Sequence, residues 1–468
     1  MKRSNFLRTL SMILLIAMTS VLLFGCASKE TPPANNPPAG TTPTEQTPAE
    51  QTPATTEKIE LRLLTPWTAG AAAYDQIEAL MAKYKAESPN ITIIHDALPT
   101  ADARTKLTVE MAAGNPPDVS WCPLSYAREF IKDDMIIDWK PVFEDPRYPE
   151  FKQWFTETSL NFASAQDGRI MLAPQEGSID GLFYNKELFQ KYGWKVPETF
   201  DELLALVPQT NKEGIATLVT GGKDGRFAWL ASALLARSAG LDNFKALTLG
   251  DKQTSWNDPA YGFVAAMEKF KAFVDAGGYP KGVLGISASE ADQMFARGEA
   301  AMYYEGAWKP GNFATAGGPE FLTKIGRVDF PAMTDRPDGD PKVRVGGNVI
   351  GIFVREGLVE PKRDAAIRLA MNICSPDFNV PIMEAGGFVY AGNVDYDKEN
   401  VSDVMNQMIQ AYRTAEAYIP SMDTIAPPAV DLAIKQTAMP GLITGEFDVQ
   451  KAVAEVQKAA EDYVKAQK

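Results

Sequence analysis

The chain has 468 residues, of which 45% are hydrophobic and 10% aromatic, and its formal net charge is −14. This composition is typical of a globular protein with an ordinary apolar core, and the length allows two domains of common size. Because so acidic a chain repels nucleic acid and anionic lipid, neither is expected as a partner. A single histidine, His95, excludes metal clusters that need several histidines.

Residues 1–25 have the pattern of a bacterial export signal. Basic residues are followed by an apolar stretch, Met12 to Phe24, that is too short for a comfortable membrane span. The stretch leads into Leu23-Phe24-Gly25-Cys26, which resembles the lipobox of bacterial lipoproteins. By that resemblance, Cys26 carries fatty acyl chains such as palmitate and becomes the N-terminus of the exported protein. No other long apolar run occurs, so we expect no other membrane span.

Residues 26–58 are expected to form a disordered linker. After Cys26 they are rich in proline and threonine and contain no aromatic or large aliphatic residue, so they cannot bury enough apolar surface to fold. A lipid anchor, a linker and a globular body therefore follow one another. We expect the body to work at the extracellular face of the cell membrane, most simply in a Gram-positive host, or at the periplasmic side in a Gram-negative one.

The first part of the body alternates strand and helix patterns. The expected elements, in chain order, are a strand at 59–64, a helix at 74–84, a strand at 91–94, a helix at about 104–113 and a strand from 119. This order and spacing are those of βαβ units, which form a parallel sheet covered by helices.

The same alternation returns further along the chain. Residues 181–184 favour a strand and 186–192 a helix, and Thr199 to Glu202 form a capping box before a helix at 203–207. A last amphipathic helix begins near Gln450. Two α/β lobes fit this length better than one very large sheet.

Four stretches in this order resemble the extracellular solute-binding proteins of bacterial ABC importers, in the group that includes maltose-binding and multiple-sugar-binding proteins. The stretches are Ala112–Val119, Pro174–Leu204, Phe295–Trp308 and Gly445–Val453. Each is a weak signal alone, but together they span nearly the whole body.

The resemblance implies an α/β fold of the two-lobed periplasmic-binding-protein type (type II). Each lobe would be a mostly parallel sheet flanked by helices, with the ligand cleft between the lobes. The expected lobe limits are 59–170 with 326–385 for lobe 1, and 171–325 with 386–468 for lobe 2. The lobes would hinge shut on a carbohydrate, in particular an oligosaccharide, and deliver it to ABC permease subunits. We expect a monomer that binds without catalysis or cofactor.

A sugar site needs flat aromatic rings for the apolar faces of the sugar and fixed polar groups for its hydroxyls. Trp308 follows the third family stretch, where members of the family place a cleft tryptophan, and Glu305 belongs to the same segment. Trp67 lies at the end of the first strand, and Trp121 and Ser125 follow the third strand. These are positions where open sheets bind ligands.

Four other positions are candidates for the same site. Glu176 follows Pro174 near the expected lobe crossover, and its carboxylate could bind hydroxyl groups. Weaker candidates beside glycine-containing or loop-like segments are Trp229, Asn348 and Tyr390. For every one of these residues, ordinary packing or a solvated loop is the competing interpretation.

Other cargoes and activities stay open. A polyamine would suit an acidic protein, and the pair Tyr303-Tyr304 is similar to the adjacent tyrosines with which some binders in this superfamily hold ferric ion. The pair lies in a strand segment, however, where neighbouring side chains face opposite ways. A surface glycoside hydrolase with paired carboxylates is a less favoured alternative. We expect no resident metal, and we expect Cys122 and Cys374 to be core residues.

Overall fold

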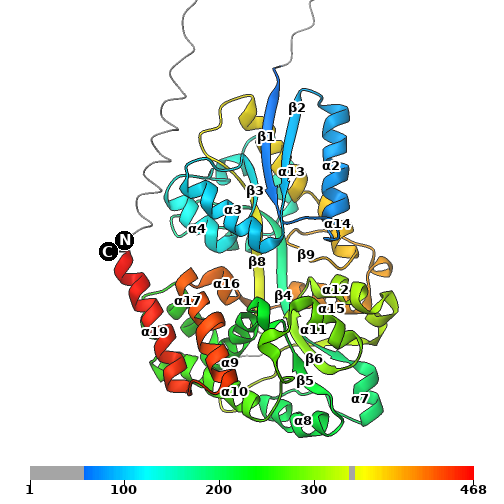
Figure 1. Ribbon diagram of the computed structural model, residues 1–468. Helices are drawn as coiled ribbons and strands as arrows, with labels where there is room; N and C mark the ends of the chain where they lie inside the picture. Colours follow the sequence, from blue (N-terminus) through cyan, green and yellow to red (C-terminus); the bar gives the residue numbers. More distant parts are fainter. Residues whose placement is uncertain (1–56, 337–342, 468) are drawn as a thin grey trace, which may run out of the picture. The chain divides into compact units, whose positions relative to one another are not determined.

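The structure is a computed structural model that describes residues 57–336 and 343–467, without the side chains of Asn348 and Val349 (Figure 1). The predicted export signal, Cys26 and almost all of the predicted linker therefore lie outside the described residues. Within the described ranges, no helix is both long enough and apolar enough to cross a membrane.

The strands form one mixed sheet in the order β2-β1-β3-β8-β4-β6-β5, in which β10 pairs with β8, and β7 and β9 pair with β4. Their bounds are β1 (Ile59–Thr65), β2 (Ile91–Ala97), β3 (Val119–Pro123), β4 (Ala173–Asn185), β5 (Ala216–Val219), β6 (Ala300–Gly306), β7 (Ile325–Val328), β8 (Val343–Val354), β9 (Val389–Tyr390) and β10 (Ala417–Ile419). The α/β fold expected from the sequence is confirmed.

The sequence predicted a mostly parallel sheet in each of two lobes, whereas the described strands join in a single sheet whose pairing is less parallel than expected. β1 pairs parallel with β2 and β3, and β5 with β6, as βαβ units require. By contrast, β8 runs antiparallel to β3 and β4, and β4 runs antiparallel to β6 and β7. The reason is that β4 and β8 are neighbouring central strands that run in opposite directions. On its other side, β8 is antiparallel to β3, and β4 is antiparallel to β6 and β7.

β4 and β8 are the long strands of the sheet, and Figure 1 shows them between β1–β3 on one side and β5 and β6 on the other. β3 pairs with residues 350–354 of β8, whereas β6 and β7 pair with residues 180–185 of β4. Between these regions the β4–β8 ladder shifts register at Pro174, Glu176 and Gly177. The predicted lobe limits stay a prediction.

Helices cover the sheet. Their bounds are α2 (Tyr74–Glu87), α3 (Thr100–Ala112), α4 (Leu124–Lys132), α5 (Lys140–Phe143), α6 (Glu157–Phe162), α7 (Lys186–Tyr192), α8 (Phe200–Lys212), α9 (Phe227–Thr248), α10 (Phe263–Asp275), α11 (Ala288–Ala296), α12 (Lys309–Gly317), α13 (Lys362–Cys374), α14 (Pro376–Glu384), α15 (Asp403–Arg413), α16 (Met422–Ile425), α17 (Pro428–Ala433), α18 (Met439–Thr444) and α19 (Val449–Ala466). The expected helices correspond to α2, α3, α7, α8 and α19.

The capping box predicted before α8 is present with both of its hydrogen bonds. The amide of Glu202 donates to Thr199 Oγ1 at 3.2 Å, and the amide of Thr199 donates to Glu202 Oε2 at 3.1 Å. These bonds satisfy backbone donors that a helix start leaves free, which is why the sequence alone located this helix.

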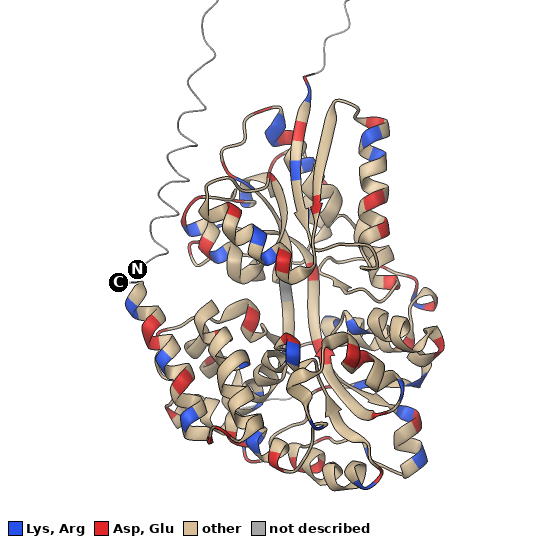
Figure 2. Cartoon of the chain, viewed as in Figure 1, with Lys and Arg blue, Asp and Glu red and all other residues tan. Residues whose placement is uncertain are grey.

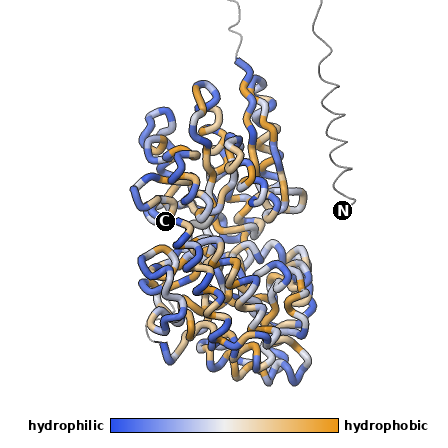
Figure 3. The backbone as a smooth tube through the Cα atoms, turned by 60° about the vertical axis from the view of Figure 1, so that its left-hand side comes forward, coloured by the Kyte–Doolittle hydropathy of each residue, from blue (hydrophilic) through white to orange (hydrophobic). Residues whose placement is uncertain are grey.

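The apolar residues gather in the interior, and charged residues lie mostly on helices and loops (Figure 2). Hydrophobic and hydrophilic residues alternate along the tube in Figure 3, as amphipathic elements require. Cys122 and Cys374 are both buried and unpaired, which confirms the expectation that they are core residues. Asp118, the residue before β3, is buried as well. Its ion pairs with Arg355 (2.7 Å) and Lys362 (2.8 Å) connect β3 to the end of β8 and the start of α13.

Candidate ligand-binding site

Three of the predicted site residues, Trp308, Glu305 and Trp229, lie together around Arg226. The two tryptophan rings meet edge to face with centroids 5.9 Å apart. The guanidinium carbon of Arg226 lies 4.6 Å from the centre of the Trp229 ring, and Arg226 Nη1 lies 3.7 Å from Glu305 Oε2. The result is a pair of aromatic rings beside a fixed guanidinium–carboxylate pair, which are the groups that a sugar site needs.

Local structure explains how these side chains meet. Glu305 is the penultimate residue of β6 and is fully buried, and Trp308 caps the N-terminus of α12 two residues after the strand ends. Arg226 and Trp229 lie at the start of α9, just beyond the loop that follows β5. Since β5 and β6 are parallel neighbours, their carboxyl ends bring both loops to one edge of the sheet.

Arg226 was not among the site residues predicted from the sequence. Its only local signal is its spacing of three residues before Trp229, which puts both on one face of the first helical turn. That spacing is common, and the partner that gives Arg226 its importance, Glu305, is brought near only by the fold.

A second group of side chains comes from α3, β3, α4 and α16. Trp121 is an internal, buried residue of β3 and does not follow the strand, as the sequence had suggested. The guanidinium carbon of Arg104 lies 5.9 Å from the ring centre of the predicted residue Trp121, and Arg104 Nη2 lies 3.9 Å from Asp423 Oδ2. The hydroxyl of Ser125, also predicted, donates to the carbonyl of Asp423 at 3.4 Å. Arg128 donates to the carbonyl of Thr424 at 3.0 Å.

β4 contributes two buried or partly buried carboxyl groups between these side chains. Burial raises the pKa of the predicted residue Glu176 to about 8, although the charge of Arg104 opposes the rise. Burial also raises the pKa of Asp180 well above its ordinary value, and the charges of Glu305 and Asp423 add to the effect. The charge interactions thus link β4 to both groups described above.

Asp431 of α17 is a further carboxyl group that the sequence did not suggest. Its Oδ2 accepts from Lys435 one helical turn on. Burial raises the pKa of Asp431, an effect that Lys435 opposes and that the charge of Asp423 reinforces. Arg104 also acts on Asp431 through its charge, which places α17 in the same electrostatic neighbourhood as α3.

Four buried polar atoms in these groups have no hydrogen-bond partner among the described residues. Two are donors, Arg104 Nε and Trp308 Nε1, and two are carboxylate oxygens, Glu305 Oε1 and Asp431 Oδ1. Buried polar atoms in native proteins are almost always paired with protein, water or a ligand. Water or a bound ligand would supply the missing partners of these four atoms.

The remaining predicted residues do not join this group. Trp67 packs in the core against Phe378 with ring centroids 5.5 Å apart, and the buried Tyr390 donates its hydroxyl to the carbonyl of Cys374 at 2.7 Å. Core packing uses both rings, so we do not include them in the proposed site. The backbone of Asn348 pairs with Gly177, and its side chain lies outside the described residues.

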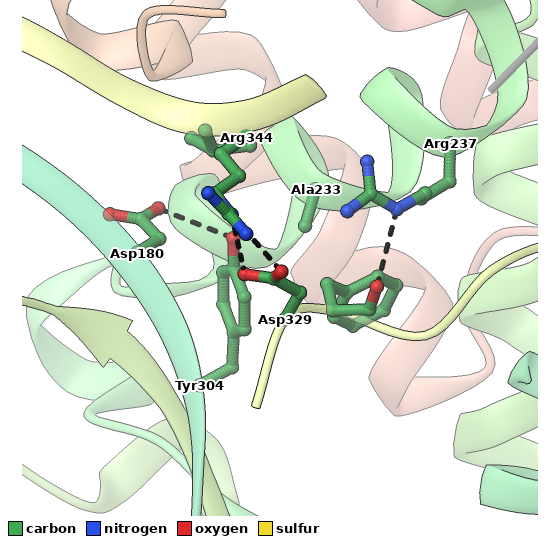
Figure 4. A pocket seen from close by; sticks show the side chains of 8 residues that line it. Asp180, Ala233, Arg237, Tyr304, Asp329 and Arg344 are labelled. Carbon is green, nitrogen blue, oxygen red and sulfur yellow. Dashed lines mark hydrogen bonds and ion pairs between the residues drawn. The ribbon is translucent and has the colours of Figure 1, made fainter. Parts of the chain in front are cut away.

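A small cavity of about 10 Å³, room for about one water molecule, lies on the β8 side of Asp180. Figure 4 shows the hydroxyl of Tyr304 pointing at Asp180, and Arg344 paired with Asp329 beside it. Arg237, across the cavity, donates to the carbonyls of Phe330 and Val343. This cavity is too small for a sugar. Among its lining side chains, Tyr304 donates a hydrogen bond to the carboxyl group of Asp180 at 3.4 Å.

Comparison with known proteins gives a consistent assignment. A curated relative from Mesorhizobium japonicum, named a probable sugar-binding periplasmic protein, is 24% identical over 86% of this chain and 94% of its own. One of the same name from Rhizobium meliloti is 25% identical over 72% of this chain and 79% of its own.

Solved structures show the same fold. A chitin oligosaccharide binding protein superposes with a TM-score of 0.78 at 23% identity, over 86% of this chain and 98% of that one. A structure described under xylan utilization by Caldanaerobius polysaccharolyticus gives 0.76 at 22% identity, over 86% of this chain and 99% of that one. The model of the family "Bacterial extracellular solute-binding protein" matches residues 68–357, which is more than half of the sequence. The chain therefore belongs to the bacterial extracellular solute-binding proteins.

Proposed function

We propose that the protein binds a carbohydrate, in particular an oligosaccharide, at the site formed by Trp308, Trp229, Glu305 and Arg104, and delivers it to the permease of an ABC importer. The names of its relatives and of its structural neighbours support a sugar as the ligand. The observation that carries the proposal is the mixture of unpaired donors and acceptors beside the two tryptophan rings.

A hydroxyl group is both a donor and an acceptor, so a sugar can satisfy every unpaired atom of the site. Its oxygens can accept hydrogen bonds from Arg104 Nε and Trp308 Nε1, and its hydroxyl groups can donate hydrogen bonds to Glu305 Oε1 and Asp431 Oδ1. A protonated polyamine offers donors alone and would leave both nitrogen donors unpaired, at a cost of about 1–3 kcal/mol each.

The ferric-ion alternative is not favoured by the described residues. Tyr303 and Tyr304 belong to different apolar clusters on opposite faces of β6. The hydroxyl of Tyr303 accepts from Lys309 at 3.3 Å, and that of Tyr304 donates to Asp180 at 3.4 Å. No group of three or more histidine, cysteine, aspartate or glutamate side chains in the described ranges could hold a metal ion. A glycoside hydrolase is not favoured either, because the family consists of binding proteins.

The proposal includes the membrane anchor. Acylation of Cys26 would hold the body near its permease and raise its effective concentration there. Replacing Cys26 by alanine is expected to abolish the incorporation of a labelled fatty acid and to release the body from membranes. Unchanged lipid labelling of the variant would exclude Cys26 as the anchor.

Thermal-shift measurements test the ligand class. The full-length protein is screened with maltose, raffinose, chitin oligosaccharides and xylo-oligosaccharides, with spermidine as the cationic comparison. A ligand at about a hundred times its dissociation constant stabilises the folded protein by about 2.7 kcal/mol. We expect a shift with at least one sugar and none with spermidine. A shift with spermidine alone would overturn the proposal.

A further inference from the structure

The charged groups of the proposed site form three pairs and leave two carboxyl groups and Arg128 over, of which Arg128 donates to the carbonyl of Thr424. Arg226 lies 3.7 Å from Glu305, Arg104 lies 3.9 Å from Asp423, and Lys435 pairs with Asp431. The two carboxyl groups without a cation in contact, among the described residues, are those of Glu176 and Asp180, both on β4.

The surroundings of Glu176 offer no compensating charge at contact distance. On the adjacent strands its Cα partners are Ile350 and Tyr390, and the hydroxyl of Tyr390 is already bonded to the carbonyl of Cys374. The ring of Tyr412 from α15 fills the space over the neighbouring Gly177. Arg104 acts on Glu176 through its charge, but the described side chains make neither a hydrogen bond nor an ion pair to the Glu176 carboxyl.

Asp180 is 5% exposed and faces more negative than positive charge. Its Oδ2 accepts from the hydroxyl of Tyr304 on β6 at 3.4 Å. Arg327 on β7 donates to the backbone carbonyl of Asp180 and not to its carboxylate. The other charged neighbours are Glu305 on β6 and Asp423 on α16, which are both acidic.

The cations across the small cavity behind Asp180 are engaged elsewhere (Figure 4). Arg344 of β8 donates to both oxygens of Asp329 at 2.9 and 3.0 Å and to the carbonyl of Ala411. Arg237 of α9 donates to the carbonyls of Phe330 and Val343. Asp180 therefore sits in a largely buried place without a cation of its own.

We propose that Glu176 and Asp180 bind the ligand as uncharged carboxylic acids, so that the site holds no unpaired negative charge and selects an uncharged ligand rich in hydroxyl groups. Asp180 is largely buried and Glu176 is partly buried. A carboxylate held away from water without a cation is costly, and protonation is the usual way to avoid that cost. With both acids neutral, each remaining acidic side chain of the site has a basic partner, in the three pairs given above. The inference rests on the proposed function, because it assumes that the ligand occupies this site.

The raised pKa values of both groups agree with this assignment. A neutral carboxylic acid donates through its O–H and accepts through its carbonyl oxygen, as a sugar hydroxyl does. A site with two such acids would bind a cation weakly, because no unpaired negative charge is left to hold it.

Calorimetric titration over a range of pH with the sugar that gives the largest thermal shift tests the inference. For the wild type we expect affinity to fall as the pH rises, by about tenfold per unit above about pH 8, because ionised Glu176 no longer donates. Glu176→Gln imitates the neutral acid and should bind at pH 7 within about threefold of the wild type while losing this pH dependence. Glu157→Gln, an exposed position on α6, is the matched control and should keep the wild-type profile. A tenfold or larger loss at pH 7 in Glu176→Gln, or a wild-type affinity independent of pH, would overturn the inference.

Infrared spectroscopy supplies a test that does not need a bound sugar. The full-length protein at neutral pH should show the carbonyl absorption of protonated carboxylic acids, reduced in Glu176→Gln and in Asp180→Asn. Identical spectra of the wild type and both variants would overturn the inference whatever the protein binds. If the band is present and only spermidine binds, the proposed function fails while the neutral acids remain. If a sugar binds and the band is absent, the inference alone fails.

Discussion

The ring of Trp308 lies directly over Gly306: a Cβ atom added to Gly306 would come within 2.2 Å of Cζ3 of Trp308. No real Cβ atom tolerates such a distance, so the absence of a side chain at residue 306 is what allows the ring its position. Gly306 is the last residue of β6, and Trp308 caps α12. The strand end thus sets the orientation of the tryptophan that we propose as a sugar platform.

We predict that Gly306→Ala weakens sugar binding by about tenfold or more, since the ring must leave its place and such overpacking typically costs about 1–3 kcal/mol. Calorimetric affinity and the tryptophan fluorescence response to the sugar measure this effect. Gly285→Ala is the matched control, because nothing lies within 4 Å of a Cβ atom at residue 285. Equal affinities of the two variants would contradict the proposed role of Gly306.

The second prediction separates a binding role of Trp308 from a packing role. Trp308→Ala should weaken sugar binding by about thirtyfold, as expected for a central aromatic anchor worth about 2 kcal/mol. It should leave the melting temperature without ligand nearly unchanged, because the ring is only partly buried. Trp256→Ala removes a fully buried ring and should cost about 3–5 kcal/mol of folding free energy. If Trp308→Ala destabilises the protein as strongly as Trp256→Ala and binds sugar normally, Trp308 belongs to the core.

Much of the fold could be predicted because its signals are local. The capping box at Thr199, the left-handed Gly193 that ends α7, and the alternating residues of β1 each define an element within a few residues. β4 was only partly predicted: the sequence suggested residues 181–184, while the strand spans 173–185. Its first half contains Pro174 and Gly177, which lower strand propensity, and it is held as a strand by long-range pairing with β8.

Some residues of the proposed site could likewise be predicted from the sequence, and others could not. The sequence suggested Trp308, Glu305 and Trp229, since a family-like motif or the chemistry of an aromatic side chain pointed to each. Arg104 and Asp423 are more than 300 positions apart, and each is an ordinary charged residue in its own segment. Only the fold brings them within 3.9 Å, so no local pattern could have paired them.

A third prediction concerns Arg226, which the sequence did not suggest. Arg226→Met should lower the free energy of unfolding by about 3 kcal/mol, because it leaves the fully buried Glu305 without its cation. Adding Glu305→Gln should restore a large part of that loss, since the neutral amide needs no counter-charge. Chemical denaturation of the wild type, both single variants and the double variant gives the coupling free energy. Additive effects would show that the pair does not matter for stability.

Stability should also depend on pH through Asp118. Burial alone would raise the pKa of this carboxyl, but hydrogen bonds from Lys362, the amide of Arg62 and Arg355 lower it below its ordinary value. The folded protein therefore binds a proton there less readily than the unfolded chain does. The stabilisation is fully present above the ordinary pKa of an aspartate and is lost as the pH falls through the lower folded value.

Asp118→Asn should accordingly destabilise the protein near neutral pH, and the difference from the wild type should shrink on acidification below about pH 4. Urea denaturation at several pH values measures it. Asp395→Asn, at an exposed position, is the control and should leave the curve unchanged. A difference between Asp118→Asn and the wild type that stays constant down to strongly acidic pH would refute the linkage.

The last prediction concerns the contact between α4 and α16. Arg128, in the first predicted lobe, donates to the carbonyl of Thr424, in the second, at 3.0 Å. If the lobes hinge shut on the ligand, this bond forms on closure and contributes to the affinity without touching the sugar. Arg128→Met keeps the length of the side chain and removes the donor. It should therefore raise the dissociation rate of the sugar by about fivefold to tenfold, while the association rate and the stability without ligand change little.

Small-angle scattering should show that the wild type becomes more compact on binding. Lys132→Met, on the exposed end of the same helix, should behave as the wild type in both measurements. If Arg128→Met dissociates as slowly as the wild type, or if sugar binding leaves the radius of gyration of the wild type unchanged, then closure at this contact does not hold the ligand.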